Sequence, residues 1–286
     1  GGGVDALQRP WEDYFTIVLW DQRQTGKSYY PADDETKPLT VQRFIEDTEE
    51  VMQYLREYLA KDKLFIMAAS WGTHLGMHMV KRHPQWIHAY VGVGQKVSSI
   101  EGERVLYERL LGHAKEKNEQ ELIKKLEGMT KVWEVVSPER EKAYTESCML
   151  VRKELSRLAG ETATRYLPHD DLMRIIALNR TISPDLTLTD ISHSLFGGAA
   201  AIMRPDITFA KSMLDGDLRK DLGNTFEAPI FFFTGKHDWQ TPVSLSDEWF
   251  EEISAPHKEL VHFEESSHTV VNEEPGKFLV SLVNRV

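Results

Sequence analysis

The sequence predicts an α/β fold in which a mostly parallel sheet has helices on its faces and a long helical insertion interrupts it. Strand-like and helix-like segments alternate up to about residue 96, and the same alternation returns after residue 223. The stretch between them is charged and helical, without convincing strands. Alternation of this kind is typical of a parallel sheet covered by helices.

The first predicted elements are a strand and a helix. Residues 14–20 (YFTIVLW) form an apolar run that predicts a buried strand. Residues 41–59 carry apolar side chains at helical spacing, and Thr40 stands directly before them as a candidate N-cap. We therefore expect a helix that starts at Val41.

A strand, a sharp turn and a helix are predicted next. The apolar run 64–69 predicts a strand, Ser70 follows it, and residues 71–82 predict a helix that Pro84 helps to end. Residues 87–93 predict another buried strand.

One helix of the insertion has a clear apolar face. Tyr144, Cys148, Val151, Leu155 and Leu158 are spaced by 4, 3, 4 and 3 residues. The spacing predicts that Cys148 is a small core residue.

The alternation resumes after Gly223 and defines the domain organisation. The expected elements are a strand at 229–234, a helix at 242–253, a strand at 259–263 and a helix at 275–283. We predict an α/β core made of residues 1–96 and 224–286, and a helical cap insertion made of residues 97–223.

Composition excludes several functional classes. Hydrophobic residues make up 41% and charged residues 28%, as in globular proteins, and the apolar runs fall far below the ~20 residues of a membrane span. The formal charge is −11, which argues against binding to nucleic acid. With one cysteine and no secretory signal at the start, the expected compartment is the cytoplasm. The expected partner is a small-molecule or short-peptide substrate, not nucleic acid or a membrane.

The segment 68–72 (AASWG) is the first candidate for chemistry. It lies between a predicted strand and a predicted helix, where a GxSxG turn holds a serine hydroxyl away from the backbone. Such a turn is crowded, so small residues are needed two positions before and after the serine, and Ala68 and Gly72 satisfy this. By itself the pattern also fits Ser70 as an ordinary helix N-cap.

Two further candidates follow the last two predicted strands. Asp238 comes just after the phenylalanine-rich strand, at the sheet edge where ligands bind in open α/β sheets. Alone, it fits a turn aspartate that caps the next helix. His268 follows the final strand, where a single loop histidine is usually solvated. The chain order Ser70, Asp238, His268 is that of α/β serine hydrolases, so together they predict a catalytic triad.

These motifs resemble those of α/β-hydrolases of the proline iminopeptidase branch. Residues 21–28 (DQRQTGKS) are similar to the DQRGxGxS turn of that branch, and 68–72 to its GxSWG elbow. Residues 235–242 (GKHDWQTP) resemble its acid-bearing loop, and 268–275 (HTVVNEEP) its terminal HxxxxExP segment. The resemblance implies an α/β-hydrolase fold with an inserted helical lid, and a serine hydrolase that releases an N-terminal residue.

The sequence departs from the family pattern in two ways. Gln24, Ala68 and Ser267 stand where glycine is usual, and none of these changes removes a reacting atom. The family also implies two or three strands before residue 14 and an HGGPG turn that supplies one oxyanion-hole N–H. Residues 1–3 (GGG) resemble the end of that turn, so we expect an upstream segment to complete the sheet.

The expected mechanism is acyl transfer through an acyl-enzyme. His268 would accept the proton of Ser70 as the hydroxyl oxygen attacks a carbonyl, and Asp238 would hold the imidazole in place. The backbone N–H of Trp71 would be one oxyanion-hole donor. No cofactor and no metal are expected.

Several neighbouring residues have two possible roles. Arg23 fits either a substrate contact or a structural ion pair. Trp71 and Trp239 fit either a pocket wall or the core.

The insertion would act as a lid over Ser70. In the family, lid carboxylates bind the α-amine of the substrate, but no acidic residue of 97–223 can be assigned to that task by sequence.

Three alternatives remain open at this point. An esterase or lactonase would use the same triad. A metal site on His74, His78 and His83 lacks the glutamate of a zincin motif, because Leu75 stands in its place. A ligand-binding homologue with slow or no catalysis would retain the same residues.

Overall fold

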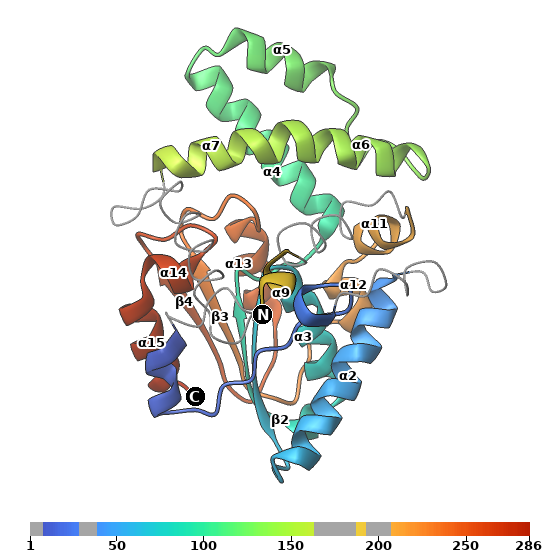
Figure 1. The fold of residues 1–286 in the computed structure, drawn as a ribbon. Helices are drawn as coiled ribbons and strands as arrows, with labels where there is room; N and C mark the ends of the chain where they lie inside the picture. The colour runs from blue at the N-terminus through green and yellow to red at the C-terminus, as the bar shows by residue number, and fades with distance from the viewer. Residues whose placement is uncertain (1–7, 29–38, 163–186, 193–206) are drawn as a thin grey trace.

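The computed structural model describes residues 8–28, 39–162, 187–192 and 207–286, and its helices flank one sheet (Figure 1). In chain order the elements are η1 (Arg9–Asp13), η2 (Gly26–Ser28), α2 (Val41–Tyr58), β1 (Leu64–Ala69), α3 (Trp71–Arg82), η4 (Pro84–Trp86), β2 (Ile87–Val93), α4 (Ser99–Glu116), α5 (Gln120–Gly128), α6 (Glu139–Ser147), η5 (Cys148–Arg152), α7 (Lys153–Thr162), α9 (Leu188–Ser192), α11 (Ile207–Leu214), α12 (Leu218–Leu222), β3 (Ile230–Gly235), α13 (Val243–Glu252), β4 (Lys258–Phe263), α14 (Val270–Glu273) and α15 (Pro275–Val283). Within these ranges, no helix is both long enough and apolar enough to span a bilayer.

The strands described lie side by side in the order β1-β2-β3-β4, and every pair is parallel. The register aligns Ala69 with Val93, Val93 with Phe233, and Gly235 with Phe263. The carboxyl ends of all four strands therefore meet at one edge of the sheet, where the segments after them can act together.

Alternation along the buried strand β3 divides the core into two layers. Phe232 packs in the cluster that α2, α3 and α13 cover, whereas Phe231 and Phe233 pack in the cluster under η1, α14 and α15. Side chains of successive strand residues point to opposite faces, which explains this division. Burial of both faces explains why β3 reads as a continuous apolar run.

Most of the predicted elements are confirmed. Strands and helices are found at 64–69, 71–82, 87–93 and 275–283 with the predicted bounds, and the other predicted elements from residue 41 onward in the α/β core differ by only a few residues. Thr40 is the N-cap of α2 and accepts a hydrogen bond from the Arg43 N–H at 3.1 Å. Strong periodicity and a capping side chain define these elements locally.

The predicted strand at residues 14–20 is wrong. This segment belongs to no strand of the described sheet, and Tyr14, Val18 and Leu19 are 60%, 46% and 45% exposed. Phe15 reaches Phe65 of β1 with 5.9 Å between ring centroids. An apolar run predicts extended backbone, but strand pairing depends on a neighbour that the run itself does not specify.

Helices α4 to α7 stand above the carboxyl edge of the sheet (Figure 1). The two ends of the insertion lie side by side, since Ser98 and Asp217 form an antiparallel bridge and the Leu218 N–H donates to the Val97 carbonyl at 2.9 Å. Among residues 97–162, 187–192 and 207–223 no strand occurs. Residues 163–186 and 193–206 lie outside the described residues, so the domain division stays a prediction.

Cys148 differs from its predicted place in the core. It begins η5, a π-helical turn, and is only partly buried. A π-turn takes one more residue than an α-helical turn, so it changes which residues of the helix form the buried line, the row of side chains that face the interior. That line runs through Ser147 to Val151, Leu155 and Leu158 instead.

Two histidines of α3 are held in the neutral form inside the molecule. His74 is 4% exposed and stacks on Trp71, with His78 one turn further along. Burial, and then the charges of His78 and Lys96, lower the pKa of His74 to about 3. Burial and the charge of Arg82 lower the pKa of His78 to about 4.

This pair predicts acid sensitivity of the fold. In the unfolded chain a histidine titrates near pH 6.5, so between that pH and about 3 to 4 the unfolded state binds protons that the folded state does not. The free energy of unfolding that the two neutral histidines contribute is complete above pH 6.5 and is lost as the pH falls. The loss is about 1.4 kcal/mol for each histidine and each pH unit. In urea titrations between pH 7 and 5, His74→Phe should lose stability less steeply than the wild type. Equal slopes would contradict this account.

Candidate active site

Ser70 sits in a strained turn between β1 and α3. Its backbone dihedrals are φ 53° and ψ −122°, in a region that residues other than glycine rarely adopt. The Ser70 N–H donates to the carbonyl of Val93 at 2.9 Å, and the Ser70 carbonyl accepts from the Thr73 N–H at 3.0 Å. Ser70 occupies the N-cap position of α3, yet its side chain makes no capping hydrogen bond. A capping hydrogen bond therefore does not explain the backbone strain at Ser70.

Gly76 makes room for close packing behind this turn. A Cβ at Gly72 would lie 3.9 Å from the Cβ of Ala68, and one at Gly76 would lie 3.1 Å from Ala68 and 2.5 Å from Tyr90. The helix therefore packs closely on the strand behind Ser70. Ala68, which departs from the family pattern, fits because Gly76 lacks a side chain, whereas a Cβ at Gly72 would make only ordinary contact with it.

Asp238 lies in the loop after β3 and is fully buried. One carboxylate oxygen accepts from the N–H groups of Gln240 and Thr241 at 2.7 and 2.9 Å. The other accepts from the Thr241 hydroxyl at 2.7 Å and from His268 Nδ1 at 2.8 Å. Burial alone would raise the pKa of Asp238, but the charge of His268 and these hydrogen bonds outweigh it and lower the pKa below its usual value.

The loop after β4 holds His268 against this carboxylate. Ser267, directly before it, donates its N–H and its hydroxyl to Glu273, each at 2.5 Å. Gly235 lets the two loops approach, because a Cβ there would lie 1.9 Å from the Ser267 carbonyl oxygen. The serine that replaces the usual glycine at 267 thus helps to fix the histidine loop.

Gly94 is a site residue that sequence reasoning missed. It follows β2 with φ +58°, and a Cβ there would lie 3.2 Å from both Asp238 Oδ2 and His268 Cε1. The Gly94 N–H donates to the Phe233 carbonyl, just as Ser70 donates to Val93, so both residues continue the strand ends at the same edge. A glycine directly after a buried strand was the available signal.

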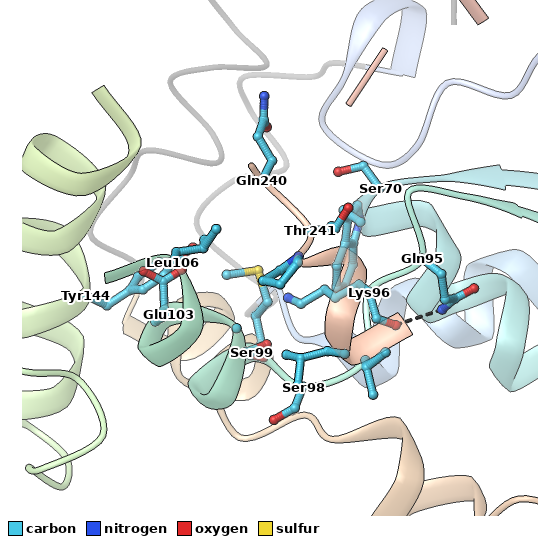
Figure 2. Close-up of a pocket in the computed structure, with 16 residues that line it drawn as sticks. Ser70, Gln95, Lys96, Ser98, Ser99, Glu103, Leu106, Tyr144, Gln240 and Thr241 are labelled. Carbon is cyan, nitrogen blue, oxygen red and sulfur yellow. Dashed lines mark hydrogen bonds between the residues drawn. The ribbon is translucent and has the colours of Figure 1, made fainter. Parts of the chain in front are cut away.

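A cavity of about 180 Å³ opens beside Ser70 (Figure 2). Thr241, which bonds to Asp238, lines the same cavity. On the opposite side, helix α4 contributes Leu106 and the carboxylate of Glu103, which is 2% exposed and accepts from the Ser147 hydroxyl at 2.8 Å. No sequence pattern distinguishes Glu103 from the many other acidic residues of the insertion.

The predicted oxyanion-hole donor is the first residue of α3. Trp71 has its N–H at the helix N-terminus, where amide groups lack intrahelical acceptors. The second donor was expected from the HGGPG-like turn, upstream of Gly1, and residues 1–7 lie outside the described residues.

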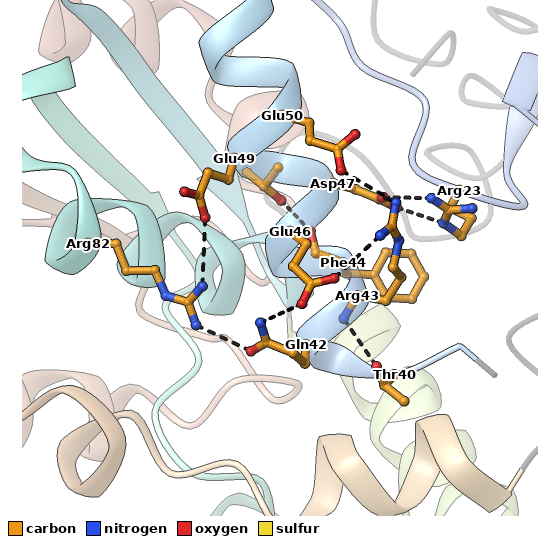
Figure 3. Close-up of polar contacts among 11 residues, drawn as sticks. Arg23, Thr40, Gln42, Arg43, Phe44, Glu46, Asp47, Glu49, Glu50 and Arg82 are labelled. Atoms are coloured by element: carbon orange, nitrogen blue, oxygen red, sulfur yellow. Dashed lines mark hydrogen bonds and ion pairs between the residues drawn. The ribbon is translucent and has the colours of Figure 1, made fainter. Parts of the chain in front are cut away.

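Arg23 is engaged in an ion pair on α2 (Figure 3). Its Nε and Nη2 donate to the two carboxylate oxygens of Asp47 at 2.7 and 2.6 Å, and Arg43 contacts the same carboxylate at 2.9 Å. Arg23 is not part of the cavity lining. This bidentate geometry favours the structural interpretation of Arg23 over a substrate contact. Gln24 beside it has φ 61°, which explains why glycine is usual there.

The two tryptophans have different places. Trp71 lines the cavity, and its indole N–H donates to Gln22 at 3.2 Å. Trp239 instead packs into the hydrophobic cluster of the insertion. No group of three or more histidine, cysteine or acidic side chains with metal-binding geometry occurs in the part of the chain described, so the histidines of α3 gain no support as a metal site.

Comparison with protein families matches residues 3–275 to the model of the alpha/beta hydrolase fold. The chain belongs to the alpha/beta hydrolase fold family. This confirms the resemblance and the predicted fold class, a parallel sheet flanked by helices.

Individual relatives of this alpha/beta hydrolase carry different names. The probable aminopeptidase YbaC of Bacillus subtilis (strain 168) is 27% identical over 285 residues, which cover 98% of this chain and 83% of YbaC. The structure of Est816, an N-acyl homoserine lactone degrading enzyme, has a TM-score of 0.60 at 18% identity and covers 100% of this chain and 89% of its own. The esterase EaEST from Exiguobacterium antarcticum has a TM-score of 0.58 at 17% identity, with 99% and 87% covered. At such identities the two structures show the shared fold.

A methyl group at Gly94 should impair hydrolysis. Gly94→Ala would combine an unfavourable φ with a Cβ pressed against Asp238 and His268, so we expect kcat on a chromogenic acyl ester to fall about tenfold or more. Gly112→Ala on α4, where a Cβ meets nothing within 4 Å, is the matched control and should keep wild-type kcat. A wild-type kcat in Gly94→Ala would show that the packing around Asp238 and His268 is not critical.

Proposed function

We propose that this hydrolase is a serine enzyme that acts through an acyl-enzyme, and that it cleaves amides of residues with a free α-amine, as an aminopeptidase does. The observation that carries the proposal is the buried Asp238–His268 pair, which stands at the sheet edge where the strained Ser70 turn also lies. Strain at a residue with no capping role and a buried charge beside a histidine are both costly, and function accounts for them.

In this proposal His268 is the general base and then the general acid. Its Nδ1–H bonds to Asp238, which fixes the tautomer and leaves Nε2 to accept the Ser70 proton during attack on the carbonyl. The low pKa of Asp238 keeps the carboxylate charged, so that it stabilises the imidazolium as it forms. The proton then passes from His268 to the leaving amine, and water releases the acyl group by the same steps in reverse.

The Trp71 N–H would stabilise the oxyanion. As the amide that follows the nucleophile at a helix N-terminus, it carries a partial positive charge where negative charge develops. Helices α4 to α7 would form the lid over this site.

The position of Glu103 favours a substrate that carries an amine. It is a buried carboxylate on the cavity wall opposite Ser70. A buried carboxylate favours a cationic partner, and the α-ammonium group of an N-terminal residue lies close to the bond that an aminopeptidase cleaves. The name of the relative YbaC, a probable aminopeptidase, agrees with this choice.

Ester or lactone hydrolysis is the second candidate. The cavity is small and has apolar walls that include Val97, Leu106 and Leu245, which suit a short acyl chain. Two similar structures are named as an esterase and as a lactone-degrading enzyme. The same triad would serve, because the leaving group is not set by the nucleophile.

Removal of the nucleophile tests the serine mechanism. Ser70→Ala should lower kcat on the order of 10⁴-fold, and a fluorophosphonate should label Ser70 in the wild-type protein. Ser281→Ala on α15, remote from the cavity lining, is the matched control and should keep both properties. Near-normal turnover by Ser70→Ala would remove the serine from its role, and a folded wild type that resists labelling would favour a non-catalytic binding protein.

Removal of the charge of Glu103 separates the two substrate classes. Glu103→Gln keeps the shape and an oxygen for Ser147, so we expect KM for an aminoacyl amide with a free amine to rise about tenfold, the value of about 1.4 kcal/mol for one lost charged contact. KM for an acyl ester without an amine should change by less than about threefold.

The control for this variant is Glu101→Gln on the same helix. Glu101 pairs with Arg104 and Arg219 outside the cavity, so this variant should leave both KM values unchanged. If Glu103→Gln affects both substrates equally, or neither, the esterase or lactonase candidate is favoured.

A further inference from the structure

We infer that Arg109 and Trp239 position the catalytic acid, so that the alignment of Asp238 depends on helix α4 of the insertion. This inference rests on the proposed function, because it concerns the triad of that function. Neither residue is part of the cavity lining, so both would act through the acid loop as positioning residues.

Arg109 contacts the acid loop in two ways. Its Nη1 donates to the backbone carbonyl of Asp238 at 3.1 Å. The guanidinium carbon lies 3.8 Å from the centre of the Trp239 ring, so the cation covers the face of the indole. One side chain of α4 thus holds two consecutive residues of the loop.

Trp239 anchors the same loop within the insertion. It is 7% exposed, and His113 of α4 meets its ring edge-on with 6.3 Å between centroids. The other buried members of its cluster all come from the insertion: Leu106, Tyr107, Leu110, Ala114, Leu122, Leu126, Val151, Leu155 and Leu158. The residue after the catalytic acid is therefore part of the core of the insertion, although it belongs to a loop of the sheet.

Asp238 is thereby held from two sides. Its carboxylate accepts hydrogen bonds from its own loop and from His268, and its backbone carbonyl accepts from α4. A shift of α4 would pull on the peptide that carries the carboxylate. A close-packed interior transmits such a displacement, and a hydrogen bond of 2.8 Å to His268 tolerates little of it.

The same helix also faces the substrate cavity. Glu103 and Leu106 line the cavity, and Arg109 lies six residues after Glu103, about 9 Å along the helix. A substrate that contacts the first turns of α4 would therefore stabilise the helix position in which Asp238 is aligned. This gives the insertion a role in catalysis besides covering the site.

Arg109→Met tests the inference, because methionine keeps an apolar contact with Trp239 and removes the donor. Per active site titrated with fluorophosphonate, we expect kcat to fall about tenfold while KM changes by less than about threefold. The acidic limb of the pH profile of kcat/KM should move to lower pH, because the imidazolium of His268 loses an aligned carboxylate. Arg109→Lys, which can still donate to the Asp238 carbonyl, should recover most of the loss.

Arg104→Met is the matched control on the same helix. Arg104 pairs with Glu101 and Glu108 outside the cavity, so this variant should keep the wild-type kcat and pH profile. If Arg109→Met does not fold, Trp239→Leu, which removes the ring beneath the guanidinium, should give the same lowered kcat and shifted limb.

Four results would overturn the inference. Wild-type kcat and pH profile in Arg109→Met would show that the contact does not align the acid. An acidic limb moved to higher pH would show that the charge acts on the imidazolium through space. Failure of both Arg109→Met and Trp239→Leu to fold would assign the contact to the fold. Absence of labelling at Ser70 in the wild type would refute the proposed function itself, whereas normal labelling with unaffected Arg109 variants would refute this inference alone.

Discussion

The proposed active site depends on the hydrogen bonds that the buried carboxylate of Asp238 accepts. A charge removed from water is costly unless hydrogen bonds and an opposite charge compensate it. Here Thr241, Gln240 and His268 supply these contacts, and the pKa of Asp238 stays low in spite of complete burial. The surrounding structure packs closely on this loop: Gly94 at the end of β2 leaves no room for a Cβ beside the carboxylate, and Arg109 donates to the backbone carbonyl of Asp238.

Parallel strand order explains how distant segments reach this point. Because β1 to β4 are neighbours in sequence order and all point the same way, the residues that follow them gather at one edge. Backbone hydrogen bonds from Ser70 to Val93 and from Gly94 to Phe233 connect successive strand ends, so the loops start from fixed positions. The glycine at 235 then lets two loop backbones approach each other, and the glycine at 76 lets α3 pack against Tyr90 and Ala68, where a side chain would collide. The parallel sheet brings the strand ends to one edge, and the segments that follow them carry the candidate catalytic side chains.

Local pattern was enough to predict much of this arrangement. Periodicity, the Thr40 cap and the small residues around Ser70 located the strands and helices of the α/β core closely, and chain order pointed to Ser70, Asp238 and His268. The failures are non-local. The run at 14–20 pairs with no strand in the described part of the chain, which its apolar pattern did not reveal. The π-turn at Cys148 altered a helical register that spacing alone could not show. Gly94, Glu103 and Arg109 make contacts with residues 44 to 174 positions away, which no short motif records.

The most direct measurement is the second-order rate constant for fluorophosphonate modification of Ser70 in the wild type and in Asp238→Asn. Asparagine preserves the size of the side chain but removes the charge and favours the wrong imidazole tautomer. If Asp238 orients His268 and His268 activates Ser70, the rate constant should fall by roughly 10³- to 10⁴-fold, with the variant still folded. Modification of Asp238→Asn at the wild-type rate would contradict the account.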